Sequence, residues 1–363
     1  MMLMERRGRL FQNSLENGRQ IGHCHVRTLT TFYQLPTANV IKLRYFFETA
    51  IIASFAWLLP RLPRRVVMML ARSVGWVAYL ADSRGRRTAR QNLRAAFQGK
   101  LSTEEVRRIT LGSYQNFART FLDLFWSAAL TPENWRQHVS IRLDDPEAEA
   151  KARATGAVWV TPHFGNFEFV SLIWGFRGIE FTVVAQDFKN PAITAIFKQL
   201  RENSGHKFIS QESAMLKLMK SLKRQGHAGL LTDLNLPPGK ASTVIDCFGL
   251  KTCVPTLHVE LARRLGLSIM TGVCLPLPDG RYEVQIFEAI QPKPGDDVTV
   301  LTQRVWDHFE KVIRVHPECW LWMYKHWRYT PAMVRDARYP DYSNPSKPMT
   351  DMVEALAARL EAQ

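Results

Sequence analysis

The most informative segment of the chain is Trp159-Val160-Thr161-Pro162-His163-Phe164-Gly165-Asn166-Phe167-Glu168. It reads as a short buried strand, then a turn with a histidine, then the first residues of a helix. The spacing of His163 and Glu168 is a weak signal on its own, because ten histidines and 33 acidic residues make about one such pair expected by chance. Its weight comes from its position after a strand, where the functional groups of α/β sheets gather.

Around this segment, short apolar runs alternate with helical patterns. Residues 102–105 form a capping box, and Asp296-Asp297 can cap a helix over 298–315. Pro255 suits the first turn of a helix that ends at Gly266. The alternating residues 281–288 add a hairpin at a sheet edge. The apolar runs cover 157–161, 181–185, 228–232 and 267–275. This alternation predicts an α/β fold with a largely parallel central sheet flanked by helices.

His163 and Glu168 suit general base catalysis if the turn brings them together. The Glu168 carboxylate would accept from one imidazole nitrogen, and the other nitrogen would take a proton from an attacking hydroxyl. Gly165 lets a substrate approach the backbone, and Asn166 can cap a helix whose first N–H groups would stabilise an oxyanion or a phosphate. These residues alone leave a structural histidine beside a surface glutamate equally open.

Several common catalytic motifs are missing from the chain. It has no Gly-x-Ser-x-Gly, no His-Glu-x-x-His, no phosphate loop and no Gly-x-Gly-x-x-Gly. A covalent serine enzyme, a zinc hydrolase and a nucleotide triphosphatase therefore lack support. The five cysteines are scattered, which predicts free thiols, and His23-Cys24-His25 has no partner cluster. We therefore predict no metal site.

The net charge of +15 is concentrated in one part of the sequence. Residues 60–100 hold ten lysines and arginines and one acid, Asp82. An apolar run over 45–59 precedes this window and another over 66–81 lies inside it, and both are shorter than the ~20 residues that cross a bilayer comfortably. Apolar helices beside arginine clusters indicate membrane contact with the basic flank in the cytoplasm. A buried core helix with a solvated basic edge is the open alternative.

A family resemblance emerges from the order of several segments. The chain resembles the bacterial lipid A biosynthesis acyltransferases, the lauroyl and myristoyl transferases related to the glycerolipid acyltransferases. Each piece is weak alone, but their order and spacing hold from about Leu43 to Trp327. The pieces are the apolar amino-terminal segment, Arg86-Arg87 with 92–97, His163-x4-Glu168, Lys189-Asn190-Pro191, and residues 201–205, 231–233, 248–249, 255–256, 316–322 and 327–328.

The resemblance implies transfer of a fatty acyl chain from an acyl thioester to a hydroxyl of a lipid A precursor or a similar glycolipid. His163 would be the general base and Glu168 its orienting partner. The residues implied in substrate binding are Asn166, Asn190, Arg201 and Asp233. Simpler readings stay open, with Arg201 as a surface helix arginine, Asp233 as a loop cap and Asn190 as a turn residue.

Two positions depart from the family pattern. Relatives often carry arginine four residues before the Asn-Pro pair, where this chain has Gln186, and glutamine after the acid that matches Asp233, where it has Leu234. These differences favour a second hypothesis, an acyltransferase for another acceptor such as a lysophospholipid, an ornithine lipid or another glycolipid. A third hypothesis is a non-catalytic basic protein that binds membranes or nucleic acid, although no nucleic-acid motif is present.

The resemblance also implies partners and location. The co-substrate would be an acyl carrier protein or coenzyme A thioester, with no further cofactor. The partners would be a membrane lipid acceptor, that thioester and an anionic membrane surface, without nucleic acid. The enzyme would lie at the inner (cytoplasmic) membrane with its catalytic domain on the cytoplasmic side. Trp320, Trp322 and Trp327 would pack in the core or lie at the headgroup level.

We predict four regions along the chain. Residues 1–40 would be a disordered basic extension or a targeting segment, and 41–82 would form apolar, membrane-associated helices. Residues 83–335 would form the acyltransferase domain, and 336–363 a tail.

Overall fold

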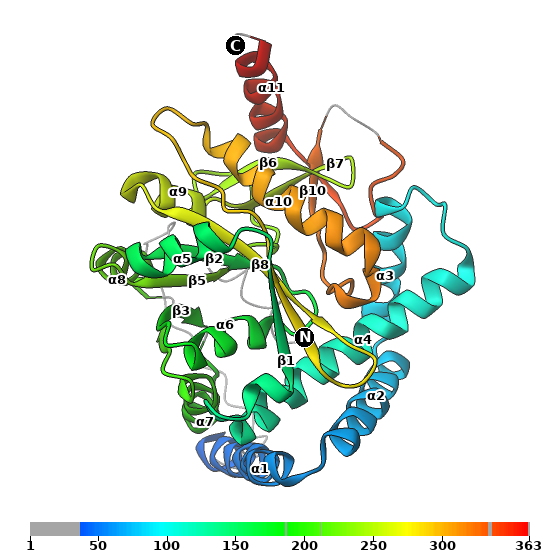
Figure 1. The fold of residues 1–363 in the computed structure, drawn as a ribbon. Helices are drawn as coiled ribbons and strands as arrows, with labels where there is room; N and C mark the ends of the chain where they lie inside the picture. Colours follow the sequence, from blue (N-terminus) through cyan, green and yellow to red (C-terminus); the bar gives the residue numbers. More distant parts are fainter. Residues whose placement is uncertain (1–36, 186, 211, 333–335, 362–363) are drawn as a thin grey trace, which may run out of the picture. The chain divides into compact units, whose positions relative to one another are not determined.

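The structure is a computed structural model that describes residues 37–185, 187–210, 212–332 and 336–361. Residues 45–363 form one compact unit (Figure 1). Apart from the first turn of α1 (Thr37–Leu58), the predicted basic extension lies outside the described residues, as does His23-Cys24-His25. The boundaries of the four predicted regions stay predictions.

A seven-stranded mixed sheet in the order β1-β9-β8-β2-β5-β3-β4 forms the centre of this unit (Figure 1). Its strands are β1 (Val139–Leu143), β2 (Ala157–Thr161), β3 (Phe181–Ala185), β4 (Lys207–Ser210), β5 (His227–Leu231), β8 (Ser268–Pro276) and β9 (Tyr282–Ile286). Neighbouring strands run parallel except β8 and β9, which are antiparallel. The predicted largely parallel sheet is confirmed. The predicted edge position of the hairpin is wrong, because β1 pairs with the outer side of β9.

The helices of this unit pack against this sheet, against smaller sheets or against one another, and several begin or end where the sequence predicts. They are α2 (Arg64–Ala81), α3 (Ser83–Ala96), α4 (Thr103–Trp126), α5 (Pro146–Thr155), α6 (Phe167–Phe176), α7 (Pro191–Glu202), α8 (Ala214–Leu222), α9 (Leu257–Leu265), α10 (Val298–Val315) and α11 (Lys347–Glu361). The capping box is formed, since Ser102 Oγ accepts from Glu105 N at 3.2 Å and Glu105 Oε2 accepts from Ser102 N at 2.7 Å. Asp297 caps α10, and Gly266 ends α9.

The predicted role of Pro255 at a helix start is wrong. It is the last residue of β7 (Leu250–Pro255), which pairs with β6 (Ser242–Cys247) in an antiparallel hairpin. A second small sheet joins β10 (Tyr329–Pro331) to β11 (Asn344–Ser346).

Strand β2 lies between two apolar cores. Successive side chains of a strand face opposite sides of the sheet, so Val158 and Val160 join the core that includes residues of α9 and α10. Ala157 and Trp159 join the core that includes residues of α4, α6 and α7. All five residues of β2 are buried, as expected for a parallel strand that is covered on both faces. The strand therefore holds the turn that follows it in a fixed position.

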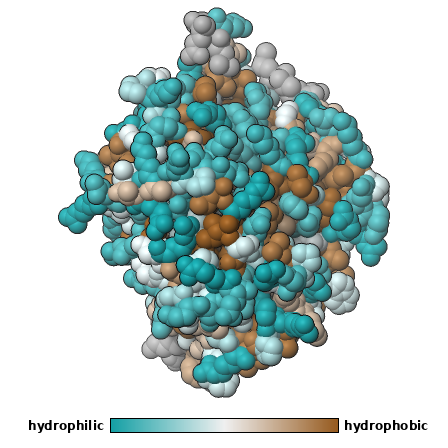
Figure 2. Space-filling view, viewed as in Figure 1, coloured by the Kyte–Doolittle hydropathy of each residue, from teal (hydrophilic) through white to brown (hydrophobic). Residues whose placement is uncertain are grey.

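The first helices carry much of the exposed apolar surface. In α2, Val67, Ala71, Gly75 and Tyr79 are buried at every fourth position, and α2 packs along α4. Its other sides expose Val66, Met69, Leu70, Val74, Trp76, Val77 and Leu80. Elsewhere, the face shown in Figure 2 is mostly hydrophilic with smaller apolar areas.

Within the described residues, no helix has both the length and the apolar character needed to cross a membrane. The membrane contact of this segment stays a prediction.

Candidate active site

His163 and Asp233 meet at the carboxyl edge of the sheet. Thr161 ends β2, Leu231 ends β5, and these two residues are partners in the parallel register. His163 and Asp233 each follow two residues later, which brings two positions 70 residues apart in sequence side by side. His163 Nδ1 lies 2.7 Å from Asp233 Oδ1, and the His163 backbone N–H donates to Asp233 Oδ2 at 3.0 Å.

The Asp233 carboxylate is fully buried and has a third donor. Trp320 Nε1 donates to Oδ2 at 2.9 Å. Burial alone would raise the pKa of Asp233, but the adjacent His163 and the further attraction and hydrogen bonds from His326 and Trp320 outweigh it and lower the pKa to about 2. Asp233 is therefore a permanent anion that fixes the orientation of the imidazole. Because Nδ1 faces Asp233, Nε2 is the ring nitrogen left for a substrate hydroxyl.

The turn after His163 is held on both sides. Gly165 has φ +55°, and a Cβ there would lie 1.9 Å from the Cys274 carbonyl oxygen. From α4, Asn116 Nδ2 and Thr120 Oγ1 donate to the Gly165 carbonyl at 3.1 and 2.9 Å. Only glycine fits this position, so Gly165 serves the close approach of backbone to backbone.

Glu168 does not act as the imidazole's partner, and that prediction is wrong. Its carboxylate accepts from Arg201 Nε at 3.1 Å and from Arg201 Nη2 at 2.6 Å, a bidentate and largely buried pair. Helix α6 begins at Phe167, so Glu168 lies in its first turn and is bonded to α7, whereas His163 lies on the turn before the helix. The ion pair also engages Arg201, whose predicted binding of substrate stays a prediction.

Comparison with known proteins identifies the family of the chain. Residues 37–329 match the family model described as bacterial lipid A biosynthesis acyltransferase. The chain belongs to this acyltransferase family. The protein is therefore an acyltransferase.

The acyltransferase is also similar to two mycobacterial proteins. One is the phosphatidylinositol mannoside acyltransferase of Mycolicibacterium smegmatis, with 24% identity over 254 residues, which cover 69% of this chain and 82% of that protein. The other is the phosphatidylinositol mannoside acyltransferase of Mycobacterium tuberculosis, with 27% identity over 190 residues, 51% of this chain and 58% of that protein.

Two predicted substrate-binding residues of the acyltransferase are engaged within the protein. Asn166 caps α6 by accepting from Phe169 N at 3.2 Å, and its Nδ2 donates to Asp123 Oδ2 at 3.1 Å. It is fully buried, so the structure gives it a positioning role in place of the predicted substrate contact. Asn190 caps α7, and its Nδ2 donates to the Tyr45 carbonyl and to Thr49 Oγ1, both at 3.1 Å. This side chain ties α7 to α1.

A buried carboxylate behind the turn was not predicted from the sequence. Asp123 of α4 is fully buried and accepts from Arg64, Asn166 and the Tyr282 hydroxyl. Arg119 lies 3.8 Å away and its guanidinium stacks over Tyr282 at 4.3 Å. The cluster joins α2, α4, β9 and the start of α6, so it holds the turn between His163 and α6 in position. No local motif marks it, because its members are far apart in sequence.

The contact of Trp320 with Asp233 was not predicted from the sequence, which gave the tryptophans 320, 322 and 327 a place in the core or at the headgroup level. Trp320, Trp322 and Trp327 are fully buried, which confirms the core reading of these residues. His326 stacks on Trp320 with ring centroids 3.8 Å apart, and burial lowers its pKa to about 4. A neutral imidazole thus supports the indole that donates to Asp233.

Proposed function

We propose that this acyltransferase moves a fatty acyl chain from an acyl thioester to a hydroxyl of a membrane glycolipid, with His163 as general base. The observation that carries this proposal is the Asp233 anion 2.7 Å from His163 Nδ1, which leaves Nε2 for the incoming hydroxyl. A buried aspartate that holds a histidine in one tautomer is the arrangement that general base catalysis of acyl transfer requires.

The proposed reaction has two steps, addition of the hydroxyl to the thioester and loss of the thiolate. His163 Nε2 takes the proton as the hydroxyl oxygen attacks the thioester carbonyl, and a tetrahedral oxyanion forms. The carbon–sulfur bond then breaks, and the proton passes from His163 to the leaving thiolate. First-turn N–H groups of a helix have no acceptor within the helix. Asn166 accepts from Phe169 N, so we assign stabilisation of the oxyanion to the N–H groups of Phe167 and Glu168 at the start of α6. Asp233 stabilises the imidazolium between the two steps.

The acceptor is proposed to be a glycolipid. The family is described by lipid A biosynthesis, and the two mycobacterial relatives are named for a mannosylated phosphatidylinositol. Both descriptions share a sugar on a membrane lipid. Gln186 and Leu234, where relatives often carry arginine and glutamine, favour an acceptor other than a lipid A precursor. A lysophospholipid or an ornithine lipid is the alternative acceptor class.

The donor and the location belong to the same proposal. An acyl carrier protein thioester suits the basic character of residues 60–100, and a coenzyme A thioester is the other candidate. The exposed apolar residues of α1 and α2 support a position on the inner membrane surface with the catalytic edge on the cytoplasmic side.

The direct test uses purified protein, both thioester donors and total membrane lipid. We expect one glycolipid class to gain the mass of one acyl chain, and His163→Ala to lower the rate by about 10²–10⁴-fold. His138→Ala is the matched control, because His138 immediately precedes β1, four strands from β5 in the sheet order, and its ring packs on Trp126. Acylation of a lysophospholipid alone would reject the glycolipid acceptor. Unchanged turnover in His163→Ala would reject the mechanism.

A further inference from the structure

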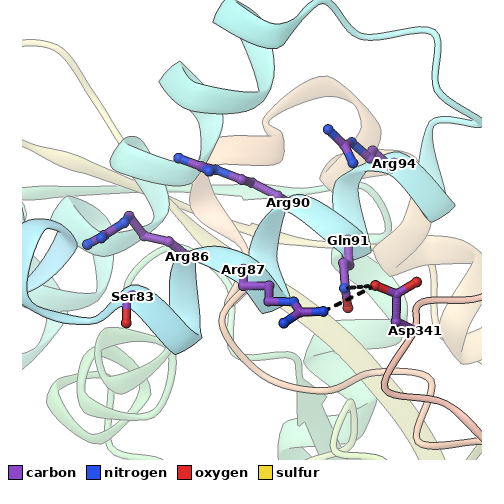
Figure 3. Close-up of a pocket in the computed structure, with 7 residues that line it drawn as sticks. All are labelled: Ser83, Arg86, Arg87, Arg90, Gln91, Arg94 and Asp341. Atoms are coloured by element: carbon purple, nitrogen blue, oxygen red, sulfur yellow. Dashed lines mark hydrogen bonds and ion pairs between the residues drawn. The ribbon is translucent and has the colours of Figure 1, made fainter.

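The outer face of α3 carries arginines around one cavity. Arg86, Arg90 and Arg94 follow each other at every fourth position, a like-charge spacing that weakens a helix. The cavity measures about 460 Å³ and is lined by Ser83, Arg86, Arg87, Arg90, Gln91, Arg94 and Asp341 (Figure 3). We call this set the α3 arginine pocket. A bound anion would offset the repulsion between these arginines.

The charges of the pocket are only partly balanced. Asp341 accepts from Gln91 at 2.6 Å and lies 3.5 Å from Arg87 (Figure 3). Arg86 donates to the carbonyls of the last turn of α2. In the part of the chain that the structure describes, Arg90 and Arg94 have no carboxylate partner. Both side chains are exposed, and a planar guanidinium suits bidentate binding of a phosphate.

The pocket begins where an apolar surface ends. Helix α2 exposes apolar side chains as far as Leu80, and α3 starts at Ser83. Trp76, Val77 and Leu80 are each about half exposed, at 51%, 57% and 51%. Hydrocarbon next to several guanidinium groups matches a molecule with an anionic head and apolar chains.

We propose that the α3 arginine pocket binds the phosphate of an anionic phospholipid whose chains lie against α2. This inference rests on the membrane contact in the proposed function, but it concerns a site apart from His163 and needs no turnover. Binding of an acidic protein would also account for the arginines, but it would not account for the adjoining apolar face of α2. The continuity of charge and apolar surface therefore favours the lipid.

The test is sedimentation of the full chain with vesicles of phosphatidylcholine, with and without phosphatidylglycerol. We expect Arg90→Gln/Arg94→Gln to weaken binding to the phosphatidylglycerol vesicles by roughly tenfold or more, since each basic residue near an anionic surface contributes on the order of a fivefold factor. Lys217→Gln/Lys220→Gln on α8 removes the same charge from another exposed helix and is the control. It should change binding less than twofold.

Further arms separate the alternatives. Arg90→Lys/Arg94→Lys keeps the charge but loses the bidentate geometry, and we expect intermediate binding. Equal losses in the α3 and α8 variants would overturn the site in favour of general charge attraction. If Arg90→Gln/Arg94→Gln still bound vesicles but no longer bound acyl carrier protein, the ligand of the pocket would be an acidic protein and the lipid proposal would be overturned. Competition by inorganic phosphate without any preference for phosphatidylglycerol vesicles would also overturn it. His163→Ala should bind vesicles like the unmodified protein, so this outcome is independent of catalysis.

Discussion

At the scale of single residues, the site depends on one buried charge. Asp233 has three donors, from the ring and backbone of His163 and from the Trp320 indole. No other group can replace that charge, because the carboxylate is buried and Glu168 is engaged by Arg201. Orientation of the catalytic ring and stabilisation of its protonated form therefore rest on the same residue.

We predict that Asp233→Asn lowers kcat by about 10²–10⁴-fold, since the amide keeps the volume but not the charge that stabilises the imidazolium. KM should change little, because Asp233 is buried and does not face a substrate. Steady-state kinetics with the acyl thioester donor would measure both values. Trp320→Phe is the matched control, as it removes one donor to Asp233 and keeps the charge, so its kcat should fall much less. Equal losses in the two variants would contradict the assignment.

The sequence identified important residues of the site but not which side chains contact each other. The position of His163 after a strand was predicted, and Asp233 was singled out after another strand. The pairing was assigned to Glu168 because it is near His163 in sequence, but the start of α6 at Phe167 sets its side chain on another element. The signal that identifies the true pair is that His163 and Asp233 each follow a strand end, Thr161 and Leu231, by two residues. It can be used only when the sheet order is known, because the order shows that these strand ends are neighbours.

At the scale of elements, the Glu168–Arg201 pair joins the first turn of α6 to the last turn of α7. Both side chains are largely buried, so an unpaired partner keeps its desolvation cost without the compensating attraction. The pair therefore stabilises the packing of α7 on α6, the helix that follows the catalytic turn.

We predict non-additive effects at this pair. Glu168→Gln and Arg201→Gln should each lower the free energy of unfolding by about 1–3 kcal/mol, and the double variant should cost less than the sum of the two. Denaturant unfolding of all four proteins measures the coupling. Lys198→Gln/Glu202→Gln breaks a more exposed pair of the same helix and should show coupling below about 0.5 kcal/mol. Additive losses at Glu168 and Arg201 would show that the bidentate contact contributes nothing.

Element predictions failed where the turn chemistry was unusual. Helix caps at Ser102 and Asp297 have clear residue signals, and the structure has both. The β6–β7 hairpin was missed because its two-residue turn is Phe248-Gly249, with φ +54° and +75°. Such turns favour Asn or Asp before Gly, and a phenylalanine in this backbone region gives no sequence signal. Pro255 was consequently read as a helix start.

At the scale of the whole molecule, burial makes protonation of two histidines unfavourable in the folded state. Burial lowers the pKa of His258 to about 3 and that of His326 to about 4. Both ring nitrogens of His258 lack a hydrogen-bond partner among the residues that the structure describes. The folded protein therefore takes up these protons only near pH 3 to 4, whereas the unfolded chain takes them up near pH 6.5.

We predict that the free energy of unfolding decreases as the pH is lowered. The variant His258→Leu tests this prediction. A depressed folded pKa means that the unfolded chain binds more protons between pH 6.5 and about 3, so stability is complete above pH 6.5 and is lost as the pH falls through this window. For His258 alone the loss between pH 8 and pH 5 is about 2 kcal/mol. His258→Leu removes that loss, and it also removes two unpaired buried nitrogens, so we expect higher stability at both pH values and a smaller difference between them. Urea unfolding at pH 8 and pH 5 measures the difference, and a variant that keeps the full pH dependence of the unmodified protein would show that His258 ionises freely in the folded state.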